Sequence, residues 1–289
     1  MAITHSVLPS NALRGWRVGV SVSESRDLNR LGLTEGHFRL ALGEIARSVL
    51  VLGGKLAYGG HLRPNGYTLF LASELRRYAR RDRPLLVCLP WSMHRQMELA
   101  ELRAASEDLG LYGRIVCLDV NGKEINPDEG RREPATPELD PARVIQGLTG
   151  LRQYMTRQTQ GRVLIGGNRE TFQGEMPGLV EEALFAIAEK QPLFLAGGFG
   201  GITMDMVEVV EPSFARWLPA FTPARTRDPR ATKSLEAFGM VTGGLGWRCL
   251  NNGLTADECQ LLASTHRPSE IATLVCLGLG RLAGAKPVA

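Results

Sequence analysis

Glycine-bearing and polar loops follow several short apolar segments of this sequence, and they hold the residues best suited to bind an anion. Glycine leaves backbone N–H groups open to a ligand, arginine can grip a phosphate or carboxylate with two N–H groups, and a helix N-terminus favours negative charge. The strongest case is the loop 196–203, in which four glycines in five positions separate an apolar segment from a predicted helix. Its candidate ligand-binding residues are Gly197, Gly198, Phe199, Gly200 and Gly201.

Three further loops in the same kind of position add charged and hydroxyl-bearing side chains. Adjacent ribose hydroxyls are natural partners for a carboxylate, while guanidinium, imidazole and amide groups supply hydrogen-bond donors. The candidate ligand-binding residues of these loops are Ser23, Glu24, Ser25, Arg26, Gly59, Gly60, His61, Arg63, Gly166, Gly167, Asn168 and Glu175. For each loop the alternative is an ordinary solvated turn.

Short apolar segments alternate with amphipathic stretches along the chain, which predicts an α/β fold. The predicted strands show little polar alternation, as a parallel sheet covered on both faces requires. They are 16–22, 55–58, 85–89, 115–120, 162–165 and 192–195. The predicted helices are 34–52, 67–80, 93–109, 141–159, 177–189, 202–210, 234–238, 255–264 and 268–281. We therefore expect a Rossmann-like, doubly wound, mostly parallel sheet with helices on both faces. The loops that follow its strands would meet at the carboxyl edge, where ligands bind.

The chain is expected to form a single domain over residues 16–282, after an N-terminal extension of residues 1–15. Four prolines and many charges predict that residues 126–141 form an exposed excursion, and a similar density of prolines predicts an irregular loop at 212–233. A split into two domains near residues 127–141 is the alternative, since 289 residues suffice for two average domains.

The composition excludes several classes of protein. A hydrophobic fraction of 44% and a charged fraction of 22% are typical of a globular chain rather than a disordered or fibrous one. A net charge of +4 suits a small anionic ligand better than a nucleic acid. Five scattered cysteines without a CxxC pair favour the cytoplasm and no metal site, and we find no signal-like or membrane-spanning apolar segment. The glycine spacing fits neither a P-loop nor a well-placed GxGxxG, which disfavours a Rossmann dehydrogenase, and we expect no cofactor.

The glycine pattern of segments 53–60, 165–167 and 197–201 resembles the SLOG superfamily, which joins DprA-type proteins, LOG phosphoribohydrolases and ligand-sensing domains. The resemblance covers residues 16–282. It implies a Rossmann-like domain that binds nucleotides or NAD-derived molecules such as ADP-ribose, as sensing versions do in TRPM channels and Thoeris anti-phage effectors. It also implies that the ligand's phosphates lie on Gly197, Gly198, Gly200 and Gly201, with the same cleft lined by Gly59, Gly60 and Gly166.

One departure from the LOG pattern bears on catalysis. The catalytic glutamate of the LOG motif PGGxGTxxE corresponds to Met204 here, and Asp205, about 100° further round the helix, is predicted to point away from that position. The resemblance therefore favours a binding protein, a sensor of a nucleotide or ADP-ribose-type ligand in bacterial defence or stress signalling. The resemblance and the base rate for soluble oligomers both favour a homodimer.

Two other functions stay open at this point. An N-glycosidase or phosphoribohydrolase would need a carboxylate from another loop, and the candidates are Glu24, Asp27, Glu170 and Glu175. A DprA-like nucleic-acid binder would need the arginines of segment 76–83 to form one exposed stripe, and their helical spacing disfavours this.

Overall fold

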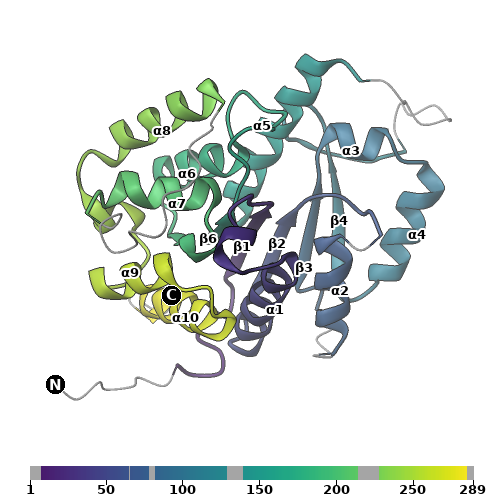
Figure 1. Ribbon diagram of the computed structural model, residues 1–289. Coiled ribbons are helices and arrows are strands. Elements are labelled where there is room, and N and C mark those ends of the chain that lie inside the picture. Colours follow the sequence, from purple (N-terminus) through teal and green to yellow (C-terminus); the bar gives the residue numbers. More distant parts are fainter. Residues whose placement is uncertain (1–7, 65, 78–81, 129–138, 214–227, 285–289) are drawn as a thin grey trace.

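A computed structural model (Figure 1) describes residues 8–64, 66–77, 82–128, 139–213 and 228–284. Within these residues, seven strands form one sheet in the order β5-β4-β3-β2-β1-β6-β7. The strands are β1 (Arg17–Ser23), β2 (Lys55–Gly59), β3 (Leu85–Leu89), β4 (Gly113–Leu118), β5 (Glu124–Ile125), β6 (Gly161–Gly166) and β7 (Leu193–Ala196). Every pair of neighbours is parallel except β4 and β5. The expected α/β, mostly parallel sheet is thus confirmed.

Helices cover both faces of this sheet, as the sequence predicts (Figure 1). In the described part of the chain they are α1 (Glu35–Val51), α2 (Tyr67–Arg77), α3 (Trp91–Arg95), α4 (Leu99–Leu109), α5 (Pro141–Gln158), α6 (Gly178–Ala188), α7 (Gly201–Val210), α8 (Pro229–Thr242), α9 (Ala256–Ser264) and α10 (Pro268–Gly284). One face packs against α1, α2, α4, α9 and α10. The other face packs against α5, and against α6, α7 and α8 near β6 and β7.

The order of the strands reverses beside β1. This strand pairs with β2 on one side and with β6 on the other, although β6 follows it in sequence only after four other strands. The chain leaves β1 toward α1 on one face and leaves β6 toward α6 on the opposite face. Diverging loops at such a reversal open a crevice at the carboxyl ends of the strands, and ligands of open α/β sheets bind there.

Two elements near β4 differ from the sequence-based expectation. The predicted helix 93–109 is divided into α3 and α4, because Glu98 begins α4 in a reciprocal capping arrangement with Glu101. The two-residue strand β5 is not predicted by apolar periodicity. It returns antiparallel to β4 after a turn in which the Asp119 carboxylate accepts hydrogen bonds from backbone N–H groups.

The structure also bears on the start of α8, on the expected N-terminal extension and on the two expected irregular segments. Helix α8 begins at Pro229, ahead of the predicted start at residue 234, because the Asp228 side chain caps its first turn and proline suits the first helical position. Within the expected N-terminal extension, Leu13 is fully buried in the core beside α1. Most of the predicted excursion 126–141 and most of the irregular loop 212–233 lie outside the described residues.

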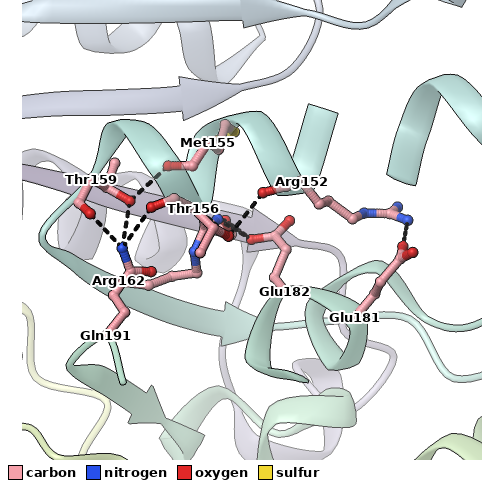
Figure 2. Close-up of polar contacts among 9 residues, drawn as sticks. Arg152, Met155, Thr156, Thr159, Arg162, Glu181, Glu182 and Gln191 are labelled. Carbon is pink, nitrogen blue, oxygen red and sulfur yellow. Dashed lines mark hydrogen bonds and ion pairs between the residues drawn. The ribbon is translucent and has the colours of Figure 1, made fainter. Parts of the chain in front are cut away.

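A cluster of buried polar side chains fastens α6 to β1 and β6 (Figure 2). Arg162 on β6 is fully buried, and its guanidinium donates to the Glu182 carboxylate on α6 at 2.6 Å. The Ser21 hydroxyl on β1 donates to the same carboxylate. A buried charge is costly unless it is paired, so this contact fixes how α6 lies on the two strands that flank the reversal.

Neighbouring contacts extend the cluster into α5 (Figure 2). The Arg152 guanidinium on α5 pairs with the Glu181 carboxylate on α6, and the Thr149 hydroxyl donates to that carboxylate at 2.6 Å. The Gln191 side-chain amide, just before β7, donates to the carbonyl of Thr159 at 2.6 Å. These bonds hold α5, α6 and the central strands in one arrangement.

Removal of the Glu182 carboxylate is expected to destabilise the fold strongly. Glu182→Ala leaves the Arg162 charge buried without its partner, and a broken buried pair costs about 3–5 kcal/mol. Urea-induced unfolding measures the change in the free energy of unfolding. The control is Asp108→Ala, which removes the partner of Arg76 in an exposed ion pair and is expected to cost no more than about 1 kcal/mol. Equal losses in the two variants would contradict a specific role for the buried pair.

Candidate functional site

Two adjoining cavities lie where the loops after β1 and β6 diverge. The smaller, here called the arginine cavity, has a volume of about 170 Å³ and is lined by Arg26, Asp27, Arg30, Gly167, Asn168, Arg169 and Glu170. The larger, here called the glutamate cavity, has a volume of about 390 Å³ and is lined by Glu24, Ser25, Arg26, Leu28, Asn29, Thr34, Glu35, Phe38, Asn168 and Thr171. They share Arg26 and Asn168, so they form the two halves of one site at the reversal point of the sheet.

The loop after β1 is shaped by local hydrogen bonds. The buried Ser25 hydroxyl accepts the backbone N–H of Asp27 at 3.2 Å. The short 3₁₀ helix η1 (Asn29–Leu31) follows and ends at Gly32, whose φ of +68° suits glycine. This turn directs Asp27 inward, where its side chain is only 3% exposed, and leaves Arg30 40% exposed.

The loop after β6 is shaped in a similar way. Gly166 and Gly167 both have positive φ angles, and the N–H of Gly167 donates to the carbonyl of Ser23 at 3.0 Å, which ties this loop to the end of β1. The Asn168 side-chain oxygen then accepts the backbone N–H of Glu170 at 2.9 Å. Asn168 therefore shapes the loop and lines both cavities at once.

A buried ionic network forms the floor of the arginine cavity. The Arg169 guanidinium donates to Asp27 Oδ2 at 2.6 Å, and to Asp205 Oδ2 at 2.7 Å and Oδ1 at 2.8 Å. It also donates to the carbonyl of Gly201 at 2.9 Å. Burial opposes its charge, but the hydrogen bond and charge of Asp205 together with those of Asp27 outweigh burial and raise the pKa of Arg169. Asp205 is thus turned toward Arg169 in the interior, one residue beyond Met204.

The glycine-rich loop 197–201 is packed tightly against its neighbours. A Cβ on Gly197 would lie 2.6 Å from the carbonyl oxygen of Ala263, and a Cβ on Gly198 would lie 2.0 Å from that of Thr265. Gly200 has a φ of +70° and lies against Asp27. The backbone N–H of Gly201, at the start of α7, donates to Asp27 Oδ2 at 2.8 Å. A carboxylate of the chain itself therefore occupies the position where the resemblance places a ligand phosphate.

The neighbouring Phe199 contributes to a wall of the glutamate cavity from behind. It is fully buried, and its ring stacks on Phe38 with a centroid separation of 4.9 Å. Phe38 in turn lines the glutamate cavity. Phe199 supports this apolar wall without lining either cavity.

The loop after β2 lies beside the two cavities but lines neither of them. Gly59 lies against the Met155 sulfur, and Gly60 against the Tyr58 ring. The Arg63 backbone N–H donates to His61 Nδ1 at 3.3 Å. Partial burial, with the charge of Arg63, lowers the pKa of His61.

The remaining predicted residues divide between the site and its surroundings. Glu24, Ser25, Arg26, Gly167 and Asn168 line the cavities. Ser23 and Gly166 end the two strands just below them. Glu175 is exposed and lies outside both linings, where its charge acts on Arg230.

Several lining residues were not among the sequence-based candidates for ligand binding. They are Asp27, Leu28, Asn29, Arg30, Thr34, Glu35, Phe38, Arg169, Glu170 and Thr171. These residues share only their position, because all of them follow one of the two strands at the reversal of the sheet. That reversal is visible only in the strand order, so the sequence did not single these residues out.

Charged groups border the glutamate cavity on the side of α2. Arg39 lies 5.3 Å from the centre of the Tyr67 ring. Burial, together with the nearby charge of Glu35, raises the pKa of Tyr67 to about 12. The charge of Glu24 raises the pKa of the same hydroxyl to a smaller extent.

A family model described as SLOG cluster2 matches residues 12–262. The chain belongs to this SLOG family. The match spans all seven strands and the linings of both cavities, so the site lies within the SLOG cluster2 region of the chain. A search of the curated proteins finds no match.

Neither a metal-binding cluster nor a membrane-spanning helix is present in the described part of the chain. Among the described residues of this SLOG chain, no group of three His, Cys, Asp or Glu side chains is arranged so that it could hold a metal ion. Within the same residues, every helix is too short or too polar to traverse a lipid bilayer.

Loss of the Arg169 guanidinium is expected to destabilise the protein far more than loss of Arg26. Arg169→Met leaves two carboxylates buried without their cation, at a cost of about 3–5 kcal/mol. The matched control is Arg26→Met, because Arg26 also pairs with a carboxylate, that of Glu170, but is 67% exposed and is expected to contribute less than about 1 kcal/mol. Chemical unfolding of both variants checks this. A loss for Arg169→Met no larger than that for Arg26→Met would show that the network does not depend on this cation.

Proposed function

We propose that this protein binds a nucleotide or a NAD-derived, ADP-ribose-type molecule across the two cavities. The observation that carries the proposal is the contiguity of a cavity lined by arginines and a cavity with carboxylate and apolar walls at the reversal point of a SLOG domain. A phosphorylated nucleoside has matching halves: an anionic end and a sugar with an aromatic base.

The arginine cavity suits the phosphate. Arg26 and Arg30 are both partly exposed, so each guanidinium can turn toward a ligand. Guanidinium groups bind phosphate oxygens through two parallel N–H donors. Gly167 lines the same cavity, but a Cβ at this position would lie 2.3 Å from the Ile202 side chain, so packing requires the glycine and the phosphate contacts come from the two guanidinium groups.

The glutamate cavity suits the nucleoside. Glu24 and Glu35 offer carboxylate acceptors for the paired hydroxyls of ribose. Leu28 and the Phe38 ring offer an apolar surface for the base. A volume of about 390 Å³ lies within the range usual for small-molecule sites.

Ligand binding has a cost that is built into the site. Arg26 is paired with Glu170 across the mouth of the two loops, so the phosphate replaces one carboxylate partner of Arg26 with another anion. Arg30 lies 3.9 Å from the Asp27 carboxylate and is 40% exposed, so the net gain comes from a second guanidinium that turns toward the phosphate, and it is sensitive to salt because both arginines are exposed. Recognition of such a ligand within bacterial defence or stress signalling is the role that we propose for the protein.

Loss of Arg30 is expected to weaken ligand binding. A panel of AMP, ADP-ribose, cyclic ADP-ribose isomers and NAD is titrated by thermal unfolding, where a ligand at one hundred times its Kd stabilises the protein by about 2.7 kcal/mol. Arg30→Ala removes a charge-assisted contact and is expected to raise the Kd of the bound ligand by about tenfold or more.

Two comparison variants sharpen this test. Arg103→Ala removes an exposed arginine of α4 that pairs with Asp128 and lies outside both cavities, and it is expected to leave the Kd unchanged. Glu170→Gln frees Arg26 from its carboxylate and is expected to lower the Kd. An unchanged Kd in both Arg30→Ala and Glu170→Gln would exclude the arginine cavity as the phosphate site.

One observation favours hydrolysis as a second candidate function. Of the four carboxylates considered from the sequence, Asp27 and Glu170 are held in ion pairs and Glu175 lies outside the cavities. Glu24 lines the glutamate cavity, and its carboxylate forms no ion pair with any residue that the structure describes. A carboxylate in that position can stabilise the positive charge that develops on ribose as an N-glycosidic bond breaks.

Chromatography of the ligands after incubation distinguishes the two functions. If the protein is a glycosidase, the wild type releases free base and Glu24→Gln is expected to abolish release while the ligand still shifts the melting temperature. If the protein only binds, every ligand is recovered intact from both proteins. Release of base at an equal rate by Glu24→Gln would remove Glu24 from the mechanism.

A further inference from the structure

Asp27 combines three contacts that bear on which ligands the site accepts. Its Oδ2 accepts the N–H of Gly201 at the start of α7 and a hydrogen bond from Arg169. Its Oδ1 lies 3.9 Å from Arg30 Nη1. The same carboxylate lines the arginine cavity. Asp27 therefore binds two buried positive groups, the N-terminus of α7 and the Arg169 guanidinium, and also lies within ion-pair distance of the partly exposed Arg30.

The charges around the arginine cavity are closely balanced. Its lining contains the guanidinium groups of Arg26, Arg30 and Arg169 and the carboxylates of Asp27 and Glu170. Behind Arg169 lies the third carboxylate, that of Asp205, which takes two of its hydrogen bonds. Three positive charges thus face three negative charges, so the site as a whole attracts an incoming phosphate only weakly.

The inner end of the cavity is also closed to a second phosphate by contact. Asp27 packs directly against Gly200, and a Cβ on Gly200 would lie 2.6 Å from Asp27 Oδ2. The helix N-terminus and the Arg169 guanidinium, the two groups that a deeper phosphate would need, both already bind this oxygen. A further phosphate would have to displace the carboxylate or lie beside it, where like charges repel.

We propose that Asp27 is a specificity-determining residue that restricts the site to ligands with a single phosphate group. This inference rests on the proposed function and narrows it. The phosphate of a nucleoside monophosphate is held by Arg26 and Arg30 at the outer side of the cavity. The second phosphate of a nucleoside diphosphate or of ADP-ribose is rejected by Asp27.

The experiment compares the Kd values of AMP, ADP and ADP-ribose by isothermal titration calorimetry. For the wild type, AMP is expected to bind at least tenfold more tightly than ADP or ADP-ribose. Asp27→Ala removes both the charge and the volume of the side chain, whereas Asp27→Asn removes the charge and keeps the size. Both are expected to reduce the preference for AMP over ADP by tenfold or more, and the larger effect is expected for Asp27→Ala.

Asp205→Asn is the matched control. It removes a carboxylate from the same Arg169 guanidinium, but from the side away from the cavity, since Asp205 does not line it. The variant is expected to lose stability as the Asp27 variants do and to keep the wild-type preference. A preference that falls equally in Asp205→Asn would show that the effect is loss of the network and not the position of Asp27.

The outcomes separate this inference from the proposed function. Binding of none of the three ligands to the wild type overturns the proposed function. Binding of ADP as tight as that of AMP, or an unchanged preference in the Asp27 variants, overturns only the role of Asp27. Should the variants not fold, competition on the wild-type protein decides: inorganic phosphate is expected to displace AMP at lower concentration than pyrophosphate does, and the reverse order overturns the inference.

Discussion

Buried charge at the carboxyl ends of β1 and β6 has to be compensated within the protein, and the Arg169 guanidinium does this for two carboxylates at once. Through Asp27 it holds the loop after β1, through Asp205 it holds α7, and it belongs itself to the loop after β6. Three segments that are far apart in the sequence therefore meet at one planar cation. The positions of the exposed groups of the site depend on this arrangement, because Arg26 and Arg30 flank Asp27 in the same short loop.

A second buried cation lies on β6, one of the two strands at the reversal of the sheet. Arg162 pairs with Glu182 and fastens α6 to the sheet (Figure 2). Buried ion pairs often add little net stability compared with apolar packing, and their best-attested contribution is to fix one arrangement among several. In this protein both pairs act on the elements that bound the reversal of the sheet. The core supplies the stability, and the ionic contacts determine the geometry of the crevice.

The sequence predicted the fold well because its apolar segments are short, well separated and divided by glycine or proline. It failed where side chains override periodicity: Glu98 divides one predicted helix, and Asp119 shapes the turn before β5. The site was predicted only in part. Glycines draw attention to a loop whether they face a ligand or a neighbouring backbone, and Gly197 and Gly198 face Ala263 and Thr265. Arg30 lies in a loop and Glu35 in the first turn of a predicted helix, and both became visible as site residues only through the strand order.

The position of β1 at the centre of the sheet also affects how the chain can fold. Along one edge, β1 pairs with β2, which follows it in the sequence after α1. Along the other edge it pairs with β6, and the backbone N–H of Arg17 donates to the side chain of Gln160, 143 residues further along the chain. During synthesis the first half of the chain therefore carries an open apolar strand edge until the sixth strand emerges. Unpaired edges of this kind are where intermolecular strand pairing begins. The latest contacts to form in this protein are thus the ones that build the crevice at the reversal of the sheet, and an incompletely folded chain both lacks that crevice and is prone to aggregate.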